Sequence, residues 1–196
     1  MPPRPSAIIR AAVVAVLLVS TILLAGCGAG ASSFDPAAPC AVDQRLPGAY
    51  PALEARIPTT LFGAAPSRLD SGRNCSAKNL GTLAGHGVTE VRFAGGLWER
   101  SSSSGVTIAV FTGDGVTAER IGEWYEASAV ATNKTGDLRP SRPTIAGRQG
   151  YRLDLVASEV PQTVIAWPAA DGAVVNVVIG AGVPEADVQA AVDALR

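Results

Sequence analysis

TVIAWPAADGAVVNVVI, residues 163–179, is the stretch of this chain that decides its fold. Two runs rich in β-branched and apolar residues, 163–167 and 173–179, flank the segment 168–172, whose proline, aspartate and glycine are typical of a turn. The stretch therefore predicts a β-hairpin. The second run is apolar on both faces apart from Asn176, and such a strand is expected to be covered on both sides of its sheet.

The sequence before the hairpin continues the same pattern. Tyr151, Leu153 and Leu155 alternate with Arg152 and Asp154, which predicts a strand with one wet face. Further strands are expected at 66–73, 88–93 and 106–111, helices at 51–56, 78–84, 117–131 and from Pro184 onward, a bend or bulge at Gly95-Gly96, and loops at 101–105 and 133–143. Strands joined largely by hairpins, with helices segregated from them, predict an α+β domain: an antiparallel sheet with helices packed on it.

The N-terminus has the features of an export signal. Arg4 and Arg10 supply positive charge, and residues 11–25 form an apolar run that is shorter than the roughly 20 residues of a spanning helix. The run ends in Leu24-Ala25-Gly26-Cys27, which resembles the lipobox of bacterial lipoproteins. An ordinary secretory signal and a retained N-terminal membrane anchor are the alternatives. All three interpretations place the rest of the chain outside the cytoplasm.

The resemblance to a lipobox implies a division of the chain into three parts. Residues 1–26 would be removed as a signal peptide, and Cys27 would carry fatty acyl chains, palmitate among them, that hold the protein on the cell membrane. Residues 27–39 are mostly Gly, Ala, Ser and Pro and are expected to form a flexible tether. Residues 40–196 are expected to form the single α+β domain.

The domain also resembles uncharacterised small lipoproteins of GC-rich bacteria. The matching features are the opening Leu53-Glu54-Ala55-Arg56-Ile57-Pro58, a middle helix, Ile145-Ala146-Gly147-Arg148 before a strand, and a closing hairpin and helix. More distantly it resembles α+β lipoproteins of the kind related to PsbP or Mog1, and lipid-carrying lipoproteins with a half-barrel. These resemblances imply binding of a ligand or partner rather than catalysis, and they transfer no site residue.

Cys40 and Cys75 are the cysteines that remain once Cys27 is lipidated. Outside the cytoplasm an even pair usually forms a disulfide, and closing this loop is worth about 3.5–4 kcal/mol in the chain-entropy model. Two buried free thiols are the alternative. A metal site is not expected, because two cysteines and the single His86 make a poor set of ligands.

The charge and the motifs of the sequence argue against nucleic-acid binding and against the common kinds of catalysis. The formal charge falls from −1 to −3 when Arg4 and Arg10 leave with the signal peptide, and no Lys/Arg run follows, so nucleic-acid binding is not expected. His86 lies between two glycines, and Ser101–Ser104 lacks the Gly-x-Ser-x-Gly elbow of serine hydrolases. We therefore expect no enzyme and no cofactor, with catalysis by carboxylates alone as the alternative.

An aromatic set is the remaining candidate site: Trp98, Trp124, Tyr125 and Trp167. These side chains either fill the core or line an apolar groove between helix and sheet, where small ligands usually bind. The expected function is a lipid-anchored binding or accessory domain of the cell envelope, and the alternative is a carrier of a lipid or another apolar molecule. The expected partners are the membrane, through the anchor, and an envelope protein or an apolar small molecule.

Overall fold

The computed structural model describes residues 34–132 and 134–195. The expected signal peptide, 1–26, and the expected lipidation site Cys27 lie outside the described residues. From Phe34 onward the chain forms one compact unit with its own hydrophobic core.

Strands account for more of this unit than helices do. The strands are β1 (Gln44–Leu46), β2 (Arg68–Asn74), β3 (Val91–Ser101), β4 (Ser104–Thr112), β5 (Thr135–Ser141), β6 (Thr144–Ile145), β7 (Arg148–Gln149), β8 (Tyr151–Ala157), β9 (Val160–Pro168) and β10 (Val175–Ala181). The helices are α1 (Pro51–Glu54), α2 (Ala77–Leu80), α3 (Thr82–Gly85), α4 (Ala118–Val130) and α5 (Glu185–Asp193).

The hairpin predicted at residues 163–179 is confirmed as β9 and β10, which pair antiparallel. In this register Trp167 lies opposite Asn176, and Ile165 lies opposite Val178. The side chains from Val175 to Val178 are buried, as expected of a strand that is covered on both sides.

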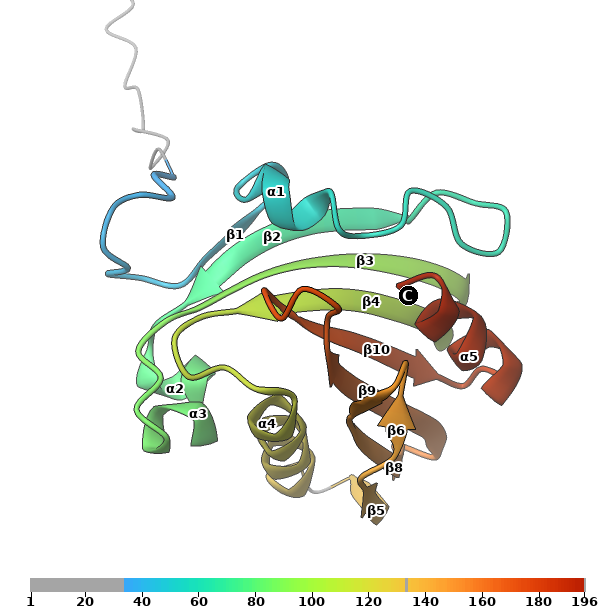
Figure 1. The fold of residues 1–196 in the computed structure, drawn as a ribbon. Helices are drawn as coiled ribbons and strands as arrows, with labels where there is room; N and C mark the ends of the chain where they lie inside the picture. Colours follow the sequence, from blue (N-terminus) through green and yellow to red (C-terminus); the bar gives the residue numbers. More distant parts are fainter. Residues whose placement is uncertain (1–33, 133, 196) are drawn as a thin grey trace, which may run out of the picture. The chain divides into compact units, whose positions relative to one another are not determined.

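The described strands other than β6 and β7 belong to one eight-stranded sheet in the order β1-β2-β3-β4-β10-β9-β8-β5. Every neighbouring pair in it is antiparallel. Figure 1 shows the sheet curving around α4. The chain leaves the sheet at the central strand β4 and re-enters it at the edge strand β5, with α4 between them. This connection crosses one face of the sheet, and Figure 1 shows α4 on the concave face.

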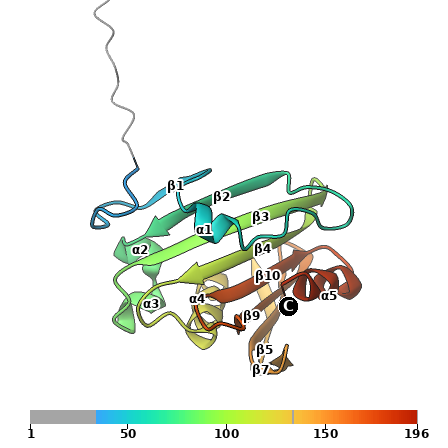
Figure 2. The same ribbon diagram turned by 45° about the horizontal axis from the view of Figure 1, so that its top comes forward.

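Helices cover both faces of the sheet. Figures 1 and 2 show α2, α3 and α4 on the concave side and α1 and α5 on the opposite side. Side chains alternate along each strand, so Ile108 packs into the core under α5 and Ala109 into the core under α4. The structure agrees with the predicted antiparallel α+β class, with the sheet as the larger component.

Three segments depart from the expected elements. Most of the expected loop 133–143 forms β5, which pairs with β8 at the edge of the sheet. β5 contains mostly polar side chains and Pro140, so it lacks the alternating apolar pattern by which strands are predicted. An edge strand tolerates polar residues and proline because one of its sides faces solvent. β3 runs through Gly95-Gly96 without interruption, and its irregularity lies between Glu99 and Ser101.

The predicted helix at 78–84 is two single-turn helices, α2 and α3. Gly81 between them has a φ of +51°, in the left-handed region that favours glycine. The side chain of Ser76 accepts a hydrogen bond from the backbone N–H of Asn79 and so caps α2.

The segment before β1 is held against the sheet edge. The predicted disulfide is confirmed: Cys40 and Cys75 are bonded, with their Cα atoms 6.1 Å apart. Arg73 donates to the carbonyl oxygen of Ala38 at 2.6 Å, and the rings of Phe34 and Tyr50 meet edge to face at 5.3 Å. The described part of the expected tether therefore contacts the domain. None of the helices within 34–132 and 134–195 combines the length and apolarity needed to cross a membrane.

Candidate functional site

The concave face carries a groove whose floor follows from the strand register. Residues opposite each other in an antiparallel sheet point to the same face, and Gly95 of β3 lies opposite Ala109 of β4. The next pair on this face is Phe93 with Phe111, whose ring centroids are 6.1 Å apart. The floor is therefore low at the two small residues and rises at the two phenylalanines.

The helix α4 supplies the wall of the groove. Thr117 caps it by accepting from the backbone N–H of Arg120, and Ile121 and Gly122 bury its sheet-facing side. Trp124 and Tyr125 follow on the groove side, with ring centroids 5.0 Å apart. Sheet and helix together enclose a cavity of about 270 Å³. This is near the lower end of the usual size of small-molecule sites.

Two residues that line this cavity carry polar groups without protein partners. Among the described residues, neither the hydroxyl of Tyr125 nor the indole N–H of Trp124 has a hydrogen-bond partner, although both residues line the cavity. Burial raises the pKa of the Tyr125 phenol, so the hydroxyl stays protonated at neutral pH. Each group can donate a hydrogen bond to a bound molecule.

Two arginines stand at the rim of the groove. Asp70 is buried, with a side chain only 4% exposed, and its two oxygens accept from Arg45 and Arg68 at 2.7 Å. The arginine side chains are 51% and 63% exposed. The guanidinium of Arg45 also lies over the ring of Phe93, 5.7 Å from its centroid. The buried carboxylate thus fixes two guanidinium groups beside the aromatic wall.

A second hollow adjoins the groove and shares Arg45, Asn74, Phe93 and Trp124 with it. Asp43 lies on its far side. Burial opposes ionisation of this carboxyl, but hydrogen bonds from Ser76, Cys75 and Asn79 hold its pKa below the usual range. Asp43 is therefore a carboxylate fixed by hydrogen bonds that tie the residue before β1 to the start of α2.

The structure divides the predicted aromatic set between the two faces of the sheet. Trp124 and Tyr125 line the groove. Trp98 and Trp167 are 3% and 1% exposed in the core on the opposite face, where the indole N–H of Trp98 donates to the carbonyl oxygen of Ala64 at 3.0 Å. Packing explains these two tryptophans completely.

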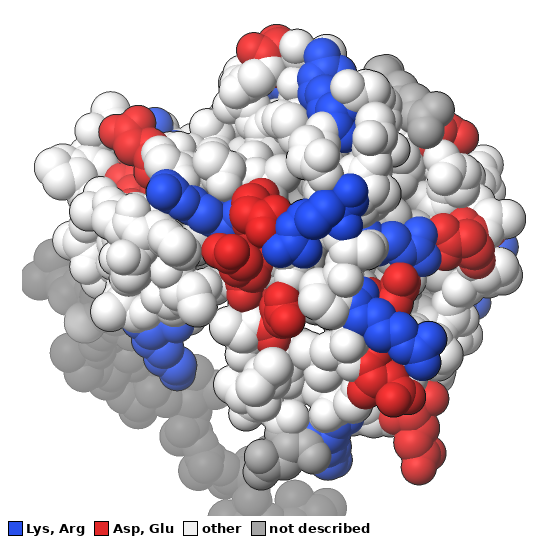
Figure 3. All heavy atoms as spheres, turned by 60° about the horizontal axis from the view of Figure 1, so that its bottom comes forward, with Lys and Arg blue, Asp and Glu red and all other residues white. Residues whose placement is uncertain are grey.

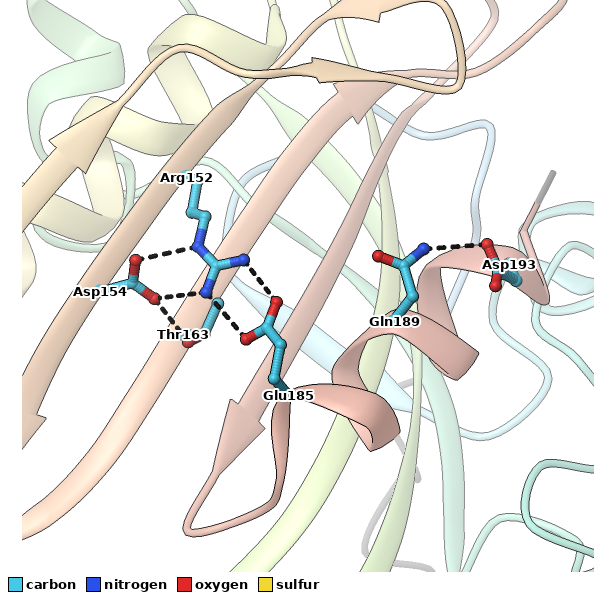
Figure 4. A network of polar contacts seen from close by, with 6 residues as sticks. All are labelled: Arg152, Asp154, Thr163, Glu185, Gln189 and Asp193. Atoms are coloured by element: carbon cyan, nitrogen blue, oxygen red, sulfur yellow. Dashed lines mark hydrogen bonds and ion pairs between the residues drawn. The ribbon is translucent and has the colours of Figure 1, made fainter.

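A second cluster of charged groups lies where α5 meets β8 (Figure 4). The guanidinium of Arg152 donates to both carboxylates of Asp154 and Glu185 at 2.7–2.9 Å, and Thr163 donates to Asp154 at 2.6 Å. The hydrogen bond from Arg152 lowers the pKa of Glu185, and bonds from Arg152 and Thr163 lower that of Asp154 against the opposing effect of burial. Both acids are ionised and engaged, so the cluster fastens α5 to the sheet and offers no proton donor.

The surface charge is mixed. On the face shown in Figure 3, Lys and Arg side chains stand next to Asp and Glu side chains rather than in a patch of one sign. Elsewhere on the domain, Arg56 pairs with Asp171 at 2.6 Å, and Arg142 pairs with Glu119. This face therefore creates no extended field that would attract a charged polymer.

Sequence reasoning did not single out Arg45, Arg68, Asp70 or Ala109 for the site. These residues meet only through the pairing of β1, β2, β3 and β4. The one available signal was Gly95 inside a strand pattern, because a glycine there often marks the close approach of another molecule. Within the described residues, no group of three His, Cys, Asp or Glu side chains is placed to hold a metal ion.

Comparison of this chain with models of protein families, with curated proteins and with solved structures gives no match.

Proposed function

We propose that this protein is a lipid-anchored binding domain on the outer side of the cell membrane, and that it holds a small apolar molecule in the groove between α4 and the concave face of the sheet. The anchor rests on Cys27 and its lipobox-like setting in the sequence. The binding role rests on the groove itself, which brings together aromatic walls, a low floor and unpartnered hydrogen-bond donors.

The observation that carries the proposal is the contrast between Gly95 and Gly96. A Cβ atom on Gly96 would lie 2.8 Å from Ile57 and 2.9 Å from Trp98, so packing on the opposite face requires glycine there. A Cβ on Gly95 would meet nothing closer than 3.6 Å. Glycine in a strand costs about 0.5–1 kcal/mol relative to alanine. At Gly95 there is room for an alanine side chain, so packing does not explain why the strand carries the less stable glycine. A groove floor that must stay open does explain it.

Filling the floor tests the binding role. The neutral fluorescent probe N-phenyl-1-naphthylamine is titrated into the chain beginning at Phe34, which forms a compact unit by itself. We expect saturable binding that Gly95→Val weakens at least about tenfold, because the valine side chain would occupy space left by the glycine. The matched control is Gly136→Val in β5, where an added Cβ meets no atom within 4 Å. Probe binding that is absent, or equal in both variants, would refute the groove as the site.

Replacement of the lipidation residue tests the anchor. Cys27→Ser in the full chain removes the thiol that would be acylated, so we expect the protein to leave the membrane fraction. Cell fractionation with immunoblotting measures this, and Cys40→Ser serves as a control that leaves Cys27 intact. Retention of the Cys27→Ser protein in the membrane would refute the lipid anchor.

A further inference from the structure

The rim of the groove holds more positive charge than the buried carboxylate requires. One arginine is enough to neutralise Asp70, yet both Arg45 and Arg68 bind it. Arg45 uses Nε and Nη2 for this purpose, and Arg68 uses Nε. The remaining terminal nitrogens have no partner among the described residues. Arg45, Arg68 and Asp70 together therefore carry a net positive charge, and the two arginines have N–H donors without a partner at the edge of an apolar cavity.

The acid that lines the adjoining hollow is held by other donors. Asp43 lies in the adjoining hollow, and its oxygens accept from the backbone N–H groups of Cys75 and Ser76 at 2.6 and 2.9 Å and from the side chain of Asn79 at 2.7 Å. Neither arginine is among its hydrogen-bond donors. The free guanidinium donors stay available on the side of Phe93 and Tyr125.

We infer that the groove takes a small amphipathic acid, with its apolar body between the α4 wall and the Gly95 floor and its anionic group on Arg45 and Arg68. This inference rests on the proposed function. Guanidinium groups bind carboxylate, sulfonate and phosphate oxygens through paired N–H donors, and a carboxylate such as Asp70 that holds them in place reduces the entropy lost on binding. The cavity of about 270 Å³ fits up to three aromatic rings or a short acyl chain, and not a two-chain membrane lipid.

A pair of probes with the same rings tests the inference. 1-Anilinonaphthalene-8-sulfonate is N-phenyl-1-naphthylamine with an added sulfonate, so the difference in their affinities reports the acidic group alone. We expect the chain beginning at Phe34 to bind the sulfonate about tenfold more tightly at low ionic strength. This preference should shrink in 0.5 M salt, because salt screens an exposed charge pair.

Substitutions of the rim arginines test whether they cause the preference for the sulfonate over the neutral probe. Arg68→Gln and, independently, Arg45→Gln should each weaken binding of the sulfonate about fivefold more than they weaken binding of the neutral probe. In either variant the other arginine still neutralises Asp70. Arg56→Gln is the control, since Arg56 pairs with Asp171 outside the groove. Gly95→Val should weaken binding of both probes.

The outcomes separate the two proposals. If the neutral probe binds, Gly95→Val weakens that binding, and the sulfonate gives no advantage, the acidic ligand is refuted and the binding groove stands. The same conclusion follows if neither arginine variant changes the ratio of the two affinities. If neither probe binds, the proposed function and this inference both fail.

Discussion

At the scale of single residues, two residues of the same type can have different roles in this domain. Gly95 and Gly96 are neighbours, but only Gly96 is forced by packing against Ile57 and Trp98. Trp124 and Trp98 likewise differ, because one lines a cavity and the other is a core residue with a satisfied indole N–H. Composition and spacing cannot distinguish such residues, since the difference lies in which face of the sheet each one meets.

Asp43 supports a prediction about pH at this scale. Its carboxylate accepts hydrogen bonds from the start of α2, and these lower its pKa below the reference value of 3.8. A lowered folded-state pKa means that the stabilisation is present above the unfolded-state value and is lost as the pH falls through the folded-state value. Asp43→Asn should therefore lower the free energy of unfolding by about 1 kcal/mol at pH 7, and by less at pH 3.

Urea denaturation of the Asp43→Asn variant and the unsubstituted protein at pH 7, 5 and 3 measures this difference. Asp114→Asn, in an exposed turn, serves as the control and should have little effect at any pH. A difference for Asp43→Asn that is as large at pH 3 as at pH 7 would contradict the assigned role of the carboxylate.

At the scale of elements, α4 determines the shape of the groove through one close contact with the sheet. A Cβ on Gly122 would lie 2.1–2.5 Å from ring carbons of Tyr151, so the helix approaches β8 at a distance that only glycine allows. The ring of Tyr151 is fully buried, and its hydroxyl donates to Glu126 of the same helix. The depth at which α4 sits thus depends on a residue that is unfavourable for helix formation.

Gly122→Ala tests the balance between helix propensity and packing. Alanine should gain about 1 kcal/mol of helix propensity, but overpacking a rigid core costs about 1–3 kcal/mol or more. With ring atoms at 2.1 Å the steric cost should prevail, so we expect a net loss of stability of about 1–2 kcal/mol and a wider groove. Thermal unfolding measures the effect, with Ala127→Gly on the exposed side of α4 as a comparison for propensity alone. A stabilised Gly122→Ala protein would refute the close contact.

At the scale of the whole molecule, the disulfide fastens the N-terminal segment and β1 to the sheet. Cys40 and Cys75 are 35 residues apart, and the bond lies next to Asp43 and to the strand that carries Arg45. Loop closure of this length removes about 3–4 kcal/mol of chain entropy from the unfolded state. The bond therefore stabilises the domain and holds one side of the groove rim.

Replacing both cysteines by alanine should lower the free energy of unfolding by about 2–4 kcal/mol. Urea denaturation measures this loss. A reducing agent should bring the disulfide-bonded protein to the midpoint of the Cys40→Ala/Cys75→Ala variant and leave the variant unchanged. Equal midpoints without reductant would show that the bond contributes no stability.

The sequence by itself determined features that depend on short-range chemistry. The turn at 168–172 with its β-branched flanks specified the hairpin, Thr117 specified the start of α4, and the even cysteine pair specified the disulfide. The tertiary structure alone decided the groove. Arg45 reaches Asp70 across 25 residues, and Gly95 meets Ala109 only in one register. A strand's alternation predicts which residues share a face but not which strands become neighbours. Which strands pair depends on the total apolar surface that the whole sheet buries, so a local sequence pattern cannot predict the pairing.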